Sequence, residues 1–108
     1  MASSFKNAAV DLTSTSRTDL YTSPSSTTAV IHNLTIANTD GTNSADITIE
    51  FYDSSATTYF YLAKTVPVPA GSTLIFDKPI NLETGDKVSL TASASNDLSA
   101  YASIMEIT

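Results

Sequence analysis

The sequence predicts an all-β protein: a single β-sandwich of about seven to eight antiparallel strands, with jelly-roll or Ig-like topology. Apolar and polar residues alternate with a period of two along most of the 108 residues, as expected for strands with one buried and one wet face. Glycines and prolines fall between these runs, where turns are expected. No window of eleven or more residues has the 3.6-residue period of an amphipathic helix.

The first half of the chain contains four expected strands. Residues 8–13 and 19–22 are short runs that precede a longer alternating segment, 28–38. His32 lies in phase with the apolar positions of that segment, so we expect it to be a hydrogen-bonded core or interface residue. Residues 46–52 (DITIEFY) alternate strictly, which predicts one buried and one wet face.

The second half contributes four more strands. Residues 58–66 (TYFYLAKTV) have aromatic and aliphatic side chains on both faces, which indicates a strand that is covered on both sides or lies at an interface. Residues 72–77 form a short apolar run. Residues 87–95 and 98–106 alternate between apolar residues and mostly hydroxyl residues, and a hairpin turn is expected between them at 96–97.

The length of 108 residues fits one hydrophobic core. We therefore expect a single β-sandwich domain over residues 8–108, preceded by an N-terminal arm over residues 1–7. Phe5 is the only large apolar side chain among residues 2–7, and we expect it to dock on a neighbouring subunit, with a frayed terminus as the alternative. The first ten residues lack the apolar run of a signal peptide, which predicts synthesis in a cytosol.

The composition argues against several classes of partner. The net charge is −6, and the five Lys and Arg residues are scattered along the chain, so neither nucleic acid nor an anionic membrane is an expected partner. Without cysteine there is no thiolate nucleophile and no disulfide. Ser and Thr make up 33 of the 108 residues. Such small side chains suit flat surfaces where other chains come close, although a soluble hydroxylated surface explains them equally well.

Catalytic patterns are not supported, and we expect a protein that is not an enzyme and has no catalytic, cofactor-binding or metal-binding residues. His32 is the only histidine, and nothing places it beside an activated hydroxyl and an orienting third group. The glutamates Glu50, Glu83 and Glu106 fall on different segments, and nothing singles out a catalytic pair. Residues 38–43 (NTDGTN) resemble half of a calcium loop, but the later glutamate is missing, and a hairpin turn explains the same residues.

The aromatic residues are the best candidates for binding. They are five Tyr and four Phe without Trp, and the cluster around residues 59–61 could stack on sugars in a binding module. More often such side chains form core and subunit interfaces, because tyrosine offers a large apolar body with a hydroxyl group. The interface candidates are Phe5, Tyr52, Tyr59, Phe60, Tyr61, Tyr101 and Met105.

Read over nearly its full length, the chain resembles a group of small virion structural proteins of tailed phages, especially marine and freshwater, cyanophage-like ones. The resemblance rests on packing and turn motifs at residues 38–44, 64–70, 74–86, 92–94 and 104–107. It implies a structural role in the particle, as a head decoration (cement) protein or as an accessory of the neck or tail, and it carries over no active-site residues.

The functional expectation follows from both lines of reasoning. The chain is expected to be a non-enzymatic virion structural protein, assembled in the host cytoplasm and located in the virion, that stabilises the capsid through subunit contacts. Expected partners are further copies of itself, a trimer being one candidate, and major capsid or neck and tail proteins. The alternatives are a neck or tail accessory protein and a glycan-binding module on the virion surface.

Overall fold

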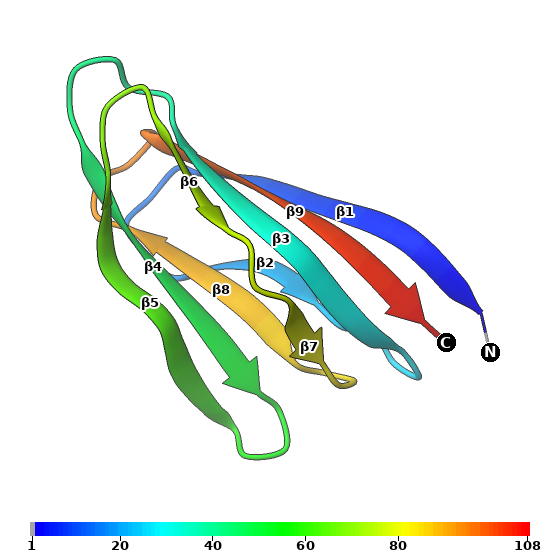
Figure 1. The fold of residues 1–108 in the computed structure, drawn as a ribbon. Coiled ribbons are helices and arrows are strands. Elements are labelled where there is room, and N and C mark those ends of the chain that lie inside the picture. The colour runs from blue at the N-terminus through cyan, green and yellow to red at the C-terminus, as the bar shows by residue number, and fades with distance from the viewer. Residues whose placement is uncertain (1) are drawn as a thin grey trace.

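The computed structural model describes residues 2–108 and confirms an all-β sandwich of two antiparallel sheets (Figure 1). No helix within residues 2–108 is long and apolar enough to cross a membrane. The strands are β1 (Ser3–Leu12), β2 (Thr18–Thr22), β3 (Thr28–Asn38), β4 (Ala45–Asp53), β5 (Thr58–Val68), β6 (Thr73–Phe76), β7 (Ile80–Leu82), β8 (Lys87–Ala92) and β9 (Leu98–Ile107).

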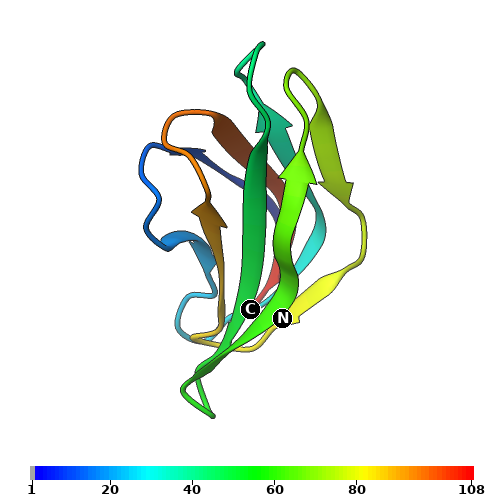
Figure 2. The same ribbon diagram turned by 90° about the vertical axis from the view of Figure 1, so that its left-hand side faces the viewer.

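The strand order identifies the topology as a jelly roll. One sheet has the order β1-β9-β3-β6, with β7 also paired to β3, and the other has the order β2-β8-β4-β5. The pairs are therefore nested: first with last, second with next to last, and so on to the central pair β4 and β5. A long hairpin rolled up on itself gives this pattern, which is that of a jelly roll and not of an Ig-like sandwich. Figures 1 and 2 show the two sheets as separate layers.

Strands β6 and β7 form one interrupted edge strand. Both pair with β3, β6 along residues 34–37 and β7 along residues 29–31. Pro79 stands just before β7 and lacks the backbone N–H that a continuous ladder would use. The interruption explains why residues 2–108 form nine strands where seven or eight were expected.

The turns at residues 38–43 and 96–97 are not hairpin turns, contrary to the sequence-based expectation. In a jelly roll most consecutive strands lie in opposite sheets, so β3 to β4 and β8 to β9 are crossings between layers. Among strands adjacent in the chain, only β4 and β5 pair as a hairpin. The turn residues were recognised correctly, but turn chemistry does not say which sheet the next strand joins.

The core lies between the two sheets and follows the predicted alternation. Ile47 and Ile49 of β4 are fully buried, and they face the other layer. On β9, Leu98, Ala100 and Ile104 point inward with at most 4% exposure. Burying each large aliphatic side chain stabilises the fold by about 1.5–3 kcal/mol, so these inward rows hold the layers together.

His32 is exposed, which corrects the expectation that it lies on the apolar face. The register of β3 against β9 shifts between Ile31 and Asn33. The bulge inserts one extra residue, so the buried positions continue at Leu34 after Ile31 instead of keeping strict alternation. His32 is in phase with the outward-facing Val30 before the bulge and not with the buried Leu34 after it.

The N-terminal arm expected over residues 1–7 also takes a different form. Within the described residues, 3–7 are the start of β1, and each pairs with a residue of β9, from Ser3 opposite Ile107 onward. Residue 1 lies outside the described residues. Backbone pairing needs no apolar side chains, which explains why this polar segment was not recognised as a strand. Phe5, the expected anchor, is 82% exposed.

One end of the sandwich is tied together by the buried carboxylate of Asp86, which is 3% exposed. It accepts hydrogen bonds from the backbone N–H and the hydroxyl of Ser54, both at 2.9 Å, and from the backbone N–H of Glu83 at 3.0 Å. The Ser23 amide donates to the Asp86 carbonyl, and the Gly85 amide donates to the Ser23 carbonyl. Three connections therefore meet at Asp86: β4–β5 and β7–β8 bond to its carboxylate, and β2–β3 bonds to its backbone carbonyl.

Candidate functional site: an interaction surface

The outer face of the five-stranded sheet carries exposed apolar side chains in register. Ala9 of β1, Tyr101 of β9, Thr35 of β3 and Ile75 of β6 lie opposite one another in a single row across four strands. Ile75 is 64% exposed and Tyr101 is 45% exposed. Large apolar groups at this exposure, in line across a sheet, are unusual on a surface that serves only solubility.

A second row runs parallel to the first near the chain termini. Phe5 of β1 lies opposite Met105 of β9, which in turn lies opposite Val30 of β3. Phe5 is the most exposed large apolar side chain among the described residues. A polar row of Asn7, Ser103 and Asn33 lies between the two apolar rows. We call this side of the sheet the β1–β9–β3–β6 face.

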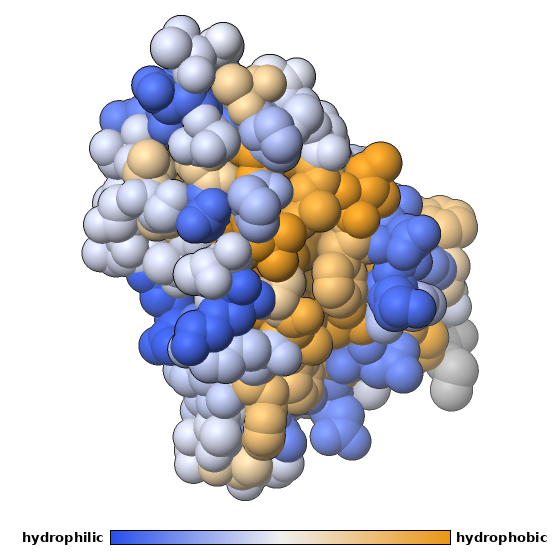
Figure 3. Space-filling view, turned by 60° about the vertical axis from the view of Figure 1, so that its left-hand side comes forward, coloured by the Kyte–Doolittle hydropathy of each residue, from blue (hydrophilic) through white to orange (hydrophobic). Residues whose placement is uncertain are grey.

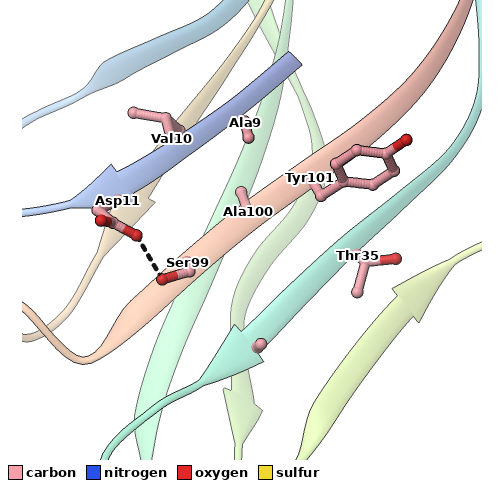
Figure 4. A pocket seen from close by; sticks show the side chains of 8 residues that line it. Ala9, Val10, Asp11, Thr35, Ser99, Ala100 and Tyr101 are labelled. Atoms are coloured by element: carbon pink, nitrogen blue, oxygen red, sulfur yellow. Dashed lines mark hydrogen bonds between the residues drawn. The ribbon is translucent and has the colours of Figure 1, made fainter. Parts of the chain in front are cut away.

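A shallow depression lies on this face beside Tyr101, where the neighbouring side chains are small (Figure 4). The depression has a volume of about 390 Å³, and Ala9, Thr35, Ala37 and Ser99 line it together with Tyr101. Near one end, the Ser99 hydroxyl donates to the Asp11 carboxylate at 2.6 Å. Its lining offers hydroxyl groups, one carboxylate already in a hydrogen bond, and apolar carbon. Such a surface suits the docking of a side chain from a partner better than bond-making chemistry.

The outer face of the four-stranded sheet is different, because it carries two ion pairs. Arg17 donates two hydrogen bonds of 3.1 Å to the Glu50 carboxylate, which is buried beneath it. The guanidinium carbon of Arg17 lies 3.8 Å from the ring centroid of Tyr59, whose ring is 4.7 Å from that of Tyr52. The bond to Glu50 raises the pKa of Arg17, so the guanidinium stays charged.

A second ion pair continues this polar face. Lys87 donates to the Asp19 carboxylate at 3.2 Å, and the Ser89 hydroxyl donates to the same carboxylate at 2.8 Å. The bond to Asp19 raises the pKa of Lys87. The Lys87 ammonium also lies 5.1 Å from the Tyr52 ring, a favourable cation–π distance. We call this surface the β2–β8–β4–β5 face.

The seven interface candidates therefore fall into three groups rather than one patch. Three lie on the β1–β9–β3–β6 face, three on the β2–β8–β4–β5 face, and one at the open side of the sandwich. These groups are, respectively, Phe5, Tyr101 and Met105; Tyr52, Tyr59 and Tyr61; and Phe60. The sequence-based reasoning missed Ile75. Its position between Leu74 and Phe76, which face inward, indicates that Ile75 faces outward.

The open side of the sandwich, between β5 and β6, exposes part of the core. Phe51 of β4 and Phe76 of β6 are only partly buried against the core, and Phe60 of β5 is 50% exposed. Figure 3 shows an apolar band along the middle of the molecule from this side. The two-sided apolar pattern of residues 58–66 reflects this position: tyrosines face outward, and Phe60 lies opposite Phe51 at the open side.

Further acidic side chains of the described residues take part in hydrogen bonds. No group of three or more acidic or histidine side chains among residues 2–108 is arranged to hold a metal ion. Glu106 accepts a hydrogen bond from the Tyr21 hydroxyl across the two sheets. Asp40, in the calcium-like turn, accepts from the Thr42 amide at 2.8 Å, which lowers its pKa. Its oxygens are thus used within the turn.

Comparison with known proteins identifies the fold. No family model and no curated protein matches the chain. A chain from the acidic stable capsid of Helicobacter pylori bacteriophage KHP30 is 12% identical, with a TM-score of 0.58 over 100% of this chain and 89% of that one. A chain from Bacillus endospore appendages, described as a novel family of disulfide-linked pili, is 18% identical, with a TM-score of 0.58 over 98% and 88% of the two chains. At these identities the likeness shows a shared fold.

Proposed function

We propose that this chain is a non-enzymatic structural subunit of a tailed-phage virion, a capsid decoration protein that docks on the shell through its β1–β9–β3–β6 face. The observation that carries the proposal is the asymmetry of the two outer faces. One exposes Ile75 and Tyr101 in a row beside a hollow of small side chains. On the other face, Arg17 and Lys87 are paired with carboxylates and lie over tyrosine rings, and Lys64 lies over the Tyr61 ring.

The two structural neighbours support different assemblies, and the composition favours one of them. The pilus neighbour comes from a family described as disulfide-linked, whereas this chain has no cysteine and cannot form such a link. The capsid neighbour places the same fold in a phage particle. The resemblance in sequence to small tailed-phage virion proteins points in the same direction.

The exposed side chains are large enough to anchor a complex. A fully covered aromatic side chain buries about 150–250 Å², so covering the 45% of Tyr101 that is exposed removes about 90 Å² from water. At about 25 cal/mol per Å² this contributes up to about 2 kcal/mol. That free energy corresponds to roughly a thirtyfold change in the dissociation constant.

The test measures binding to purified heads and tails of the phage whose genome encodes the chain. We expect the wild-type chain to bind heads stripped of it, and Tyr101→Ala to bind up to roughly thirtyfold more weakly. Tyr61→Ala is the matched control, because Tyr61 is 59% exposed and lies on the opposite face. Equal losses in both variants, or a loss in Tyr61→Ala alone, would be incompatible with docking through the β1–β9–β3–β6 face.

Two alternatives remain distinct outcomes of this experiment. Binding to tails or necks, with the same dependence on Tyr101, would make the chain a neck or tail accessory. A glycan-binding role would instead use Tyr61, whose ring lies beside the Lys64 ammonium at 5.0 Å on the polar face. A glycan array with the wild-type chain and Tyr61→Ala separates that role, since only it predicts a signal that the substitution removes.

A further inference from the structure

The four free edges of the two sheets are not equally protected. Natural sheets discourage strand addition with short strands, bulges and prolines at their edges. Strand β2 has five residues and a register shift. Strand β5 has two register shifts, a positive φ of 48° at Thr65, and Pro67. The β6–β7 edge is interrupted next to Pro79.

Strand β1 has none of these three features, and its charged side chains are Lys6 and Asp11. Its ten residues pair with β9 in one unbroken register, from Ser3 opposite Ile107 to Leu12 opposite Leu98. Among the described residues no strand pairs with its other side, and Figure 1 shows it at the margin of its sheet. A long, regular and unpaired edge is a ready template for another strand.

The backbone groups on the free side of β1 can be identified from its hydrogen bonds. Ala2 and Thr108 exchange two bonds, amide to carbonyl in both directions, at 3.0 and 2.8 Å. In an antiparallel ladder, residue pairs that exchange hydrogen bonds alternate with pairs that do not. The even-numbered residues of β1 therefore bond to β9. Odd-numbered residues, 3 to 11, therefore direct their N–H and C=O groups toward the open edge.

We infer that a second copy of this chain pairs with β1 as an antiparallel strand, about a two-fold axis through Asn7. Each odd-numbered residue then lies opposite an odd-numbered residue of the second copy. The outer faces of the two sheets therefore lie on the same side. Phe5 lies opposite Ala9, Ser3 lies opposite Asp11, and Asn7 lies opposite itself. The five pairs can form about ten backbone hydrogen bonds. A hydroxyl opposite a carboxylate and two facing amides are favourable cross-strand pairs.

Neighbouring registers that keep the faces aligned are worse. An axis through Lys6 opposes two ammonium groups directly, which destabilises a strand pair. An axis through Ala8 places Phe5 opposite the carboxylate of Asp11. Axes nearer either end of the strand leave fewer residues paired. The sequence of β1 therefore favours the register centred on Asn7.

The surface beside β1 supports the same occupant. Ala9 lines the hollow that Tyr101 borders, and in the proposed register Phe5 of the second copy lies directly across from Ala9. The alanine is small, so the phenyl ring can extend over it toward the Tyr101 ring. The pairing covers part of Phe5, which is 82% exposed in the single chain.

The dimer joins the two five-stranded sheets into one continuous sheet. This inference deepens the proposed function, because it would double the width, across the strands, of the face proposed to dock. The pairing itself does not depend on a particle being present. A dimer without affinity for heads would contradict only the docking proposal. Chains that bind heads as monomers would contradict only the dimer.

The register can be tested with single cysteines, because the natural chain has none. Asn7→Cys places two cysteines opposite each other, with Cα atoms about 5.5 Å apart, within the range of a disulfide. Ser3→Cys is the matched control on the same exposed strand. In the proposed register two such cysteines lie about 26 Å apart along the strand direction. Under mild oxidation we expect Asn7→Cys to form covalent dimers and Ser3→Cys to remain uncoupled.

A proline variant tests the backbone pairing itself. Asn7→Pro removes an N–H that points to the open edge and leaves the bonds of β1 to β9 in place. We expect its dimer dissociation constant in sedimentation equilibrium to rise at least tenfold, while Asn7→Ala dimerises like the wild type. The inference fails if the wild-type chain is monomeric, if both cysteine variants couple equally, or if Asn7→Pro dimerises unchanged.

Discussion

Replacing Asp86 by alanine should cost about 3 kcal/mol of folding free energy. The carboxylate accepts three hydrogen bonds, and hydrogen bonds to charged groups contribute about 1.5–3 kcal/mol each. The Ser54 hydroxyl keeps a second acceptor in the variant, the Thr84 carbonyl at 3.2 Å. The two backbone amides, of Ser54 and Glu83, lose their only recorded partner, and water reaches them in part. Two such losses give the estimate.

Urea denaturation measures this loss. With a denaturant slope of about 1–3 kcal/mol per molar, the midpoint should fall by about 1–3 M while the slope is unchanged. Asp86→Asn keeps one acceptor oxygen and should lose about half as much. Asp53→Ala is the control, because the Asp53 carboxylate accepts its hydrogen bonds from its own turn, at Ser55 and Ala56, and it should cost under about 1 kcal/mol. Equal costs for Asp86→Ala and Asp53→Ala would refute the idea that Asp86 ties three connections together.

Three further predictions concern the ends of the pH range and the turns. Burial raises the pKa of Tyr21, so above about pH 10 the unfolded chain ionises while the folded chain does not; stability should fall there, and less steeply in Tyr21→Phe. The hydrogen bond from the Thr42 backbone N–H lowers the pKa of Asp40, so the contribution of Asp40 to stability is present above about pH 4 and is lost in more acid solution; Asp40→Asn should flatten that loss in acid urea titrations. Gly85 has φ of +88°, and a Cβ there would lie 3.1 Å from the Ser54 hydroxyl oxygen, so Gly85→Ala should destabilise by about 1 kcal/mol or more. Gly41→Ala, with open space around it, should change the melting temperature little, and equal shifts in the two glycine variants would count against this explanation.

The sequence predicted the fold class because strands with one buried face alternate between apolar and polar residues. Residues 28–38 coincide with β3, and the inward face of residues 98–106 is buried as expected. A bulge leaves no such trace, since an inserted residue looks like any other, and this is why His32 was placed on the wrong face. Strand β7 was missed because three residues after a proline are too few to show a period.

The candidate surface was less accessible to sequence reasoning than the core. Arg17 and Glu50 are 33 residues apart in sequence, and Tyr59 joins them only because β4 and β5 pair in one particular register. Cations that look scattered along the chain therefore converge on one face. The row of Tyr101 and Ile75 likewise depends on the nesting order of the jelly roll, which alternation within single strands does not specify.

The central claim is that the β1–β9–β3–β6 face docks on a phage head while the opposite face stays in water. Hydroxyl-radical footprinting of the chain, free and bound to heads, tests it directly, because tyrosines report on both faces. Docking as proposed predicts strong protection of Tyr101 on binding, with Tyr61 as reactive as in the free chain. Protection of Tyr61 with Tyr101 still reactive would contradict it.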